Sequence, residues 1–108
     1  MRKLEITRKG VGNYSREELF KEATSQLKTI GEMIKANEKE TVISEITDSH
    51  AIHFRLPSKQ TSSSVIEGTM HLEAGDCKSI AHIPENYPLG SIAVQEIEKF
   101  FNNPFRES

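Results

Sequence analysis

The sequence predicts an α+β domain: a single antiparallel β-sheet with β-α-β-β-β-β-α order and both helices packed on one face. Two long segments carry apolar residues every three or four positions, which is the period of a helix with one buried face. Five shorter segments alternate apolar and polar residues, as half-buried strands do. Four of these strands follow one another through short connections, which favours an antiparallel meander, and the helices need an apolar surface to cover.

The N-terminal part of the chain predicts a strand and then a helix. Leu4 and Ile6 alternate with charged neighbours and indicate the strand. Ser15 and Glu18 have the spacing of a capping box, which marks a helix N-terminus. The helix is expected over residues 16–36, with Asn37 as its stop, because apolar residues recur at Leu19, Ala23, Leu27, Ile30 and Ile34.

The middle of the chain predicts the remaining four strands, at residues 41–46, 50–56, 65–73 and 77–83. The polar run 57–64 is expected to be a flexible loop. A two-residue turn before Cys77 would direct four residues toward the same face as Met70 and Leu72. These four are Cys77, Ser79, Ala81 and Ile83.

A second amphipathic helix is expected near the C-terminus, with apolar positions between Leu89 and Phe101 and an end set by Pro104. No repeat or boundary interrupts the chain, so residues 1–108 are expected to form a single domain. The order of elements resembles that of the TATA-binding protein repeat and, more loosely, of helix-grip domains. This resemblance is one of topology, so it implies no activity and no site residue.

Composition argues against several classes of partner. Fourteen basic and sixteen acidic residues give a net charge of −2, which lacks the basic excess of a general nucleic-acid binder. No stretch approaches the roughly 18 apolar residues of a membrane span. The single cysteine, Cys77, rules out an intrachain disulfide and suits a reducing compartment. We therefore expect a soluble cytoplasmic protein without a nucleic-acid or membrane partner.

The loop "GVGNYS" comes closest to a named motif. A dinucleotide-binding turn needs a third glycine where this chain has Ser15, and a Walker A loop needs a Gly-Lys-Ser/Thr ending that is absent here. The Ser15 hydroxyl and the Glu18 carboxylate would also occupy the amides that an anion would use. This loop is therefore expected to change direction and cap the helix rather than hold a phosphate.

The reactive side chains give little support for catalysis. Cys77 and His82 are five residues apart in one strand and so face opposite ways, which keeps a thiolate and its base from meeting. We therefore name no catalytic residue and expect no cofactor. As a weaker alternative, three histidines on neighbouring strands are expected to face outward, with His53, Thr69 and His82 in one row. With Glu67 nearby, this cluster would suit zinc through His53, His71 and His82.

The outward face of the sheet is the more informative surface. It is expected to carry mixed charges interrupted by isolated aliphatic residues, which suits a protein partner or a second copy of the chain. The residues expected to bind the partner are Ile43, Arg55, Glu67, His71 and Ile80. The sequence thus favours a non-catalytic protein-interaction or regulatory module, homodimeric through the open sheet face or an edge strand.

The alternative is a small-ligand carrier, or a small helix-grip-type enzyme, with a pocket between the sheet and the C-terminal helix. Gly68 and Ser79 are small inward residues that would leave space for a ligand. His50 and Tyr87 would be the polar groups nearest the mouth of that pocket.

Overall fold

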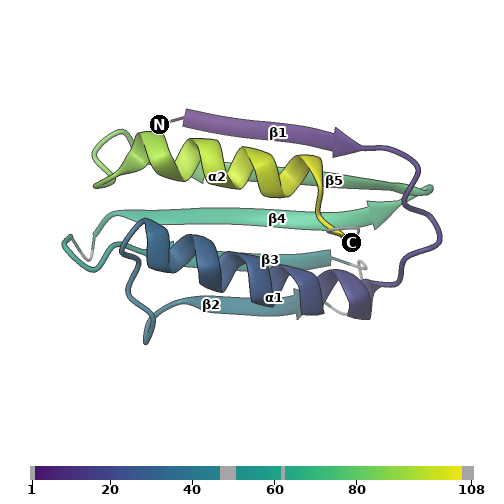
Figure 1. Cartoon of the computed structure of the whole chain (residues 1–108), viewed down its shortest axis with the longest axis horizontal. Coiled ribbons are helices and arrows are strands. Elements are labelled where there is room, and N and C mark those ends of the chain that lie inside the picture. The colour runs from purple at the N-terminus through teal and green to yellow at the C-terminus, as the bar shows by residue number, and fades with distance from the viewer. Residues whose placement is uncertain (1, 47–50, 62, 106–108) are drawn as a thin grey trace.

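The computed structural model describes residues 2–46, 51–61 and 63–105. The elements are β1 (Arg2–Arg8), α1 (Arg16–Met33), β2 (Val42–Ile46), β3 (Ala51–Pro57), β4 (Val65–Glu73), β5 (Asp76–Ile83) and α2 (Gly90–Asn102). The five strands form one sheet in the order β1-β5-β4-β3-β2, and every neighbouring pair is antiparallel. Figure 1 shows α2 lying over β1 and β5, and α1 lying over β3 and β2, on the same face. The predicted fold class is confirmed.

The first helix begins where its capping box predicted and ends earlier than expected. The Glu18 amide donates to Ser15 Oγ at 3.2 Å, and the Ser15 amide donates to Glu18 Oε1 at 3.1 Å. At the other end Lys35 has a φ of 58°, and the Ala36 amide donates to the Gly31 carbonyl at 2.8 Å. This is the geometry of a Schellman cap, so the helix ends at Met33 rather than at residue 36. The residue with left-handed backbone angles is a lysine. Glycine at this position would have indicated the end of the helix in the sequence, whereas lysine does not.

The glycine-containing loop after β1 crosses the turn between β4 and β5. The Val11 amide donates to the Gly75 carbonyl at 2.8 Å. A Cβ on Gly12 would lie 3.1 Å from the Gly75 Cα, so glycine permits this close backbone approach. At the start of α1, the Glu18 side chain accepts from the Ser15 amide and the Ser15 side chain accepts from the Glu18 amide. The expectation of a turn that caps the helix is confirmed.

The hairpin between β4 and β5 has a two-residue turn, which is the condition under which the sequence predicted the facing of β5. Ala74 and Gly75 have φ values of 51° and 82°, and both positive angles fit a type I′ turn. The turn sets Leu72 opposite Cys77 and Met70 opposite Ser79. Residues 77, 79, 81 and 83 therefore face the helices, as expected.

The core fills the space between the sheet and the two helices. One row of inward residues crosses all five strands, consisting of Ile43, Phe54, Gly68, Ala81 and Leu4. A Cβ on Gly68 would lie 2.2 Å from Phe54 Cζ, so the aromatic ring fills the space above the glycine. The same ring meets Phe101 of α2 edge-on, with centroids 6.2 Å apart. The row therefore ties the sheet directly to the second helix.

The polar run after β3 is anchored at both ends. Pro57 belongs to β3, and Ser58 forms a β-bridge with Ala36. The Ser58 amide donates to the Ser64 carbonyl at 2.8 Å, and both serines are buried. The described part of this run, whose composition predicted a flexible loop, is thus closed by a backbone hydrogen bond between its two buried serines.

The described residues that follow α2 fold back over the start of α1. α2 ends at Asn102, and Pro104 follows as predicted. Pro104 and Phe105 are buried, and the Phe105 ring stacks on Tyr14 with centroids 4.0 Å apart. Within the described residues, neither helix is long and apolar enough to cross a membrane.

Candidate functional site

The two edge strands of the sheet differ in how well their side chains protect them from pairing with another strand. In the described part of the chain, β1 and β2 each have a strand neighbour on one side only. The β1 edge carries charged side chains at Arg2, Lys3, Glu5 and Arg8, a common protection against unwanted strand pairing. On β2, Val42 and Ile46 project from the outer face with exposed fractions of 46% and 41%, and Ser44 lies between them. The outer face of β2 therefore lacks the charged side chains that protect β1 against pairing with another strand.

The register of β2 corrects one of the predicted partner-binding residues. Ile43 lies opposite Phe54, and Glu45 lies opposite Ile52, so both face the helices. Glu45 Oε2 accordingly lies 3.3 Å from Arg16 Nε at the start of α1. Ile43 was expected on the outward face, and that placement is wrong. A shift of one residue exchanges the two faces of a strand, and the strand's pattern alone does not fix this parity.

The outer face of the sheet carries the other four predicted partner residues, Arg55, Glu67, His71 and Ile80. Its charges are largely matched across strands. Arg55 Nε donates to Glu67 Oε1 at 3.2 Å. Glu73 lies 2.9 Å from His71 Nε2 and 3.3 Å from Lys78 Nζ. Hydrogen bonds from His71 and Lys78 lower the pKa of the Glu73 carboxyl. A face whose charged side chains already have partners is stable when it is exposed to solvent, so it does not need a partner protein to pair its charges.

The predicted histidine cluster does not assemble. His53 lies opposite Thr69 as expected, but Thr69 lies opposite Ile80, and His82 lies opposite Glu67. The register between β4 and β5 thus differs by two residues from the one expected. Across the described ranges, no three His, Cys, Asp or Glu residues are placed to hold a metal ion. The zinc alternative therefore has no geometric support.

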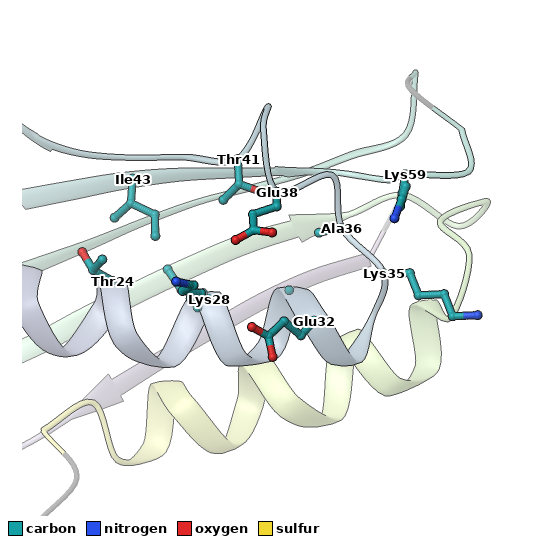
Figure 2. A pocket seen from close by; sticks show the side chains of 11 residues that line it. Thr24, Lys28, Glu32, Lys35, Ala36, Glu38, Thr41, Ile43 and Lys59 are labelled. Carbon is teal, nitrogen blue, oxygen red and sulfur yellow. The ribbon is translucent and has the colours of Figure 1, made fainter.

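A groove lies between α1 and the edge strand β2, with a volume of about 600 Å³. Figure 2 shows it bounded by the helix on one side and by β2 with the loop before it on the other. The residues that line it are Thr24, Leu27, Lys28, Gly31, Glu32, Lys35, Ala36, Glu38, Thr41, Ile43 and Lys59. No prediction from the sequence placed a hollow here.

The described residues of the predicted pocket under α2 do not line a common cavity. The space above Gly68 is taken by the Phe54 ring. The Tyr87 hydroxyl is buried and donates to the Leu56 carbonyl at 3.0 Å, which ties the loop before α2 to β3. Neither Gly68 nor Tyr87 lines the groove beside α1. Ser79 is buried on the inner face, as expected. His50 lies outside the described residues.

Burial also determines the reactivity of Cys77, the one cysteine of the chain. Cys77 faces the helices and is fully buried, with its Sγ 3.7 Å from Ser79 Oγ. Burial raises the pKa of the Cys77 thiol. A thiol held in its neutral form is a weak nucleophile, so this arrangement does not activate it.

The buried Tyr87 hydroxyl gives a pH dependence of stability. Burial raises its pKa from 10.0 to about 12. The unfolded chain loses this proton near pH 10, whereas the folded protein keeps it until about pH 12. Stability that is fully present below pH 10 is therefore lost as the pH rises to about 12. Urea unfolding of wild type and of Tyr87→Phe should show the wild type losing stability relative to the variant across this window. An unchanged difference would contradict the assignment.

Comparison with known proteins adds no relative from which a function could be transferred. A scan against models of protein families finds no match, and a search of curated proteins finds no similar chain.

Proposed function

We propose that this protein is a non-catalytic interaction module that self-associates through the edge strand β2. The observation that carries the proposal is the contrast between the two sheet edges, because β1 is protected by charges and β2 exposes Val42 and Ile46. An exposed apolar edge strand is a ready template for pairing with another strand. A second β2 that pairs with it would extend the sheet across two copies of the chain.

The sequence of β2 is self-complementary in the antiparallel arrangement. A two-fold axis through Ser44 sets Val42 opposite Ile46 of the second copy and Ser44 opposite Ser44 of the second copy. The outer face of the pair then carries two Val–Ile pairs and a central Ser–Ser pair and no charge, which favours cross-strand contact. On the inner face Ile43 lies opposite Glu45 of the second copy, so the two carboxylates do not oppose each other. Between the two β2 strands themselves, residues 42–46, no like charges meet in this register.

The edge is a better interface than the outer sheet face. Arg55, Glu67, Glu73 and Lys78 already form cross-strand pairs there. Covering those charges would remove them from water without giving them new partners, which costs free energy. Pairing at β2 instead would add backbone hydrogen bonds between the two strands and cover two exposed aliphatic side chains.

Sedimentation equilibrium tests this interface. The wild type is expected to show a concentration-dependent monomer–dimer equilibrium. In the proposed register Ser44→Glu sets two carboxylates opposite each other, so the dissociation constant should rise by about tenfold or more. Thr7→Glu on the exposed outer face of β1 is the matched control, and it should leave association unchanged. A wild type that stays monomeric throughout, or equal effects of the two variants, would overturn the proposal.

A further inference from the structure

We propose that the groove between α1 and β2 is a binding site for a small amphipathic molecule with an apolar body and one anionic end. The groove volume of about 600 Å³ lies within the range of small-molecule sites. The inference does not depend on self-association, because the groove lies on the helix side of β2 within one chain.

The floor of the groove is apolar. Leu27 and Gly31 of α1 are buried, and Ala36 and Ile43 are half-buried on the other side of the groove. In Figure 2 the Ile43 side chain points from β2 toward the helix. A surface of this kind favours an apolar body and offers it little hydrogen bonding.

Gly31 indicates that the space is kept open rather than left by chance. Glycine in a helix is less favourable than alanine, yet Gly31 lies inside α1. Its φ is not positive, so the backbone does not require glycine. A Cβ there would meet only the Ala36 Cβ at 3.6 Å, an ordinary contact, so close packing does not require glycine either. What a methyl group would change is the depth of the groove.

The rim carries charged side chains of both signs. Lys28 and Lys59 face the groove together with Glu32 and Glu38, so the charges at the groove balance, while Lys35 also belongs to the lining. Among the described residues, none of these three lysines lies within 4.0 Å of a carboxylate oxygen, so their ammonium groups are available to a ligand. Figure 2 shows Lys28 projecting from the helix beside the groove and Lys59 approaching from the opposite side, while Lys35 points away. An anionic end that reached Lys28 or Lys59 would therefore meet an ammonium group that has no carboxylate within 4.0 Å among the described residues.

Fluorescence titration with 1-anilinonaphthalene-8-sulfonate tests the site, because this probe combines an apolar ring system with one sulfonate. We expect saturable binding of one probe per chain. N-phenyl-1-naphthylamine has the same rings without the sulfonate and should bind about two- to fivefold more weakly, the scale of an exposed ion pair. Lys28→Gln should weaken binding of the sulfonate about two- to fivefold and leave binding of the neutral probe unchanged.

Gly31→Ala is the decisive variant. The added methyl should weaken both probes by about tenfold or more, because it occupies the floor of the groove. The same variant is expected to be more stable than wild type, so lost binding cannot be attributed to unfolding. Thr29→Ala also favours helix but lies outside the groove, and it should bind as the wild type does. Absence of saturable binding, or equal binding by wild type and Gly31→Ala, would overturn the site. Equal affinity for the two probes would overturn its anionic specificity.

Discussion

Gly68→Ala is expected to lower the free energy of unfolding by about 3 kcal/mol, the upper range for a methyl group forced into a filled core. The new Cβ would lie 2.2 Å from Phe54 Cζ and 2.8 Å from the Ile80 carbonyl oxygen. The aromatic ring also packs edge-on against Phe101, and the carbonyl belongs to the neighbouring strand. Neither can move without disturbing the sheet or the helix packed on it.

Urea unfolding of the wild type and the variant gives this loss directly. Phe54→Leu shortens the side chain above Gly68, so adding it to Gly68→Ala should recover part of the loss and show non-additivity between the two sites. Gly90→Ala is the matched control, since a Cβ there meets nothing closer than 3.9 Å. If Gly68→Ala and Gly90→Ala were equally stable, the packing of Phe54 over the glycine would be wrong.

Phe105→Ala is expected to cost about 3–4 kcal/mol, as deletion of a buried aromatic ring usually does. Phe105 is 5% exposed and stacks on Tyr14, with an angle of 11° between the rings. The contact holds the segment after α2 against the start of α1. Thermal unfolding should therefore show a large fall in midpoint.

Two further variants separate the contributions at Phe105. Phe105→Leu keeps most of the buried area and loses the ring stacking, so it should cost only about 1 kcal/mol beyond the difference in size. Asn103→Ala is an exposed control in the same segment and should have little effect. A Phe105→Ala variant as stable as the Asn103→Ala control would show that the C-terminal segment does not contribute to the fold.

Much of the fold could be predicted because its signals are local. Apolar periodicity located both helices and the strands, and the Ser15–Glu18 spacing located the start of α1. The two-residue turn at Ala74 and Gly75 gave the facing of β5 from the facing of β4. Each of these inferences needed only residues that are close in the sequence.

The parts that failed depend on the register of neighbouring strands and on the spacing between elements. The facing of Ile43 depends on how β2 meets β3. The two-residue turn sets His82 opposite Glu67, so the expected row of His53, Thr69 and His82 was inconsistent with that turn. The groove depends on how far α1 stands from β2, which no strand or helix pattern encodes. One signal was present in the sequence, since Gly31 interrupts an otherwise good helix beside Lys28 and Glu32.

Mixing two charge variants tests the central claim, self-association through β2, most directly. Ser44→Glu and Ser44→Lys should each be largely monomeric alone, because a two-fold axis through residue 44 opposes like charges. An equimolar mixture should form a heterodimer at least as tight as the wild-type dimer, measured by sedimentation equilibrium, because opposite charges then face each other. A mixture that remains as monomeric as its components would contradict pairing at β2 in this register.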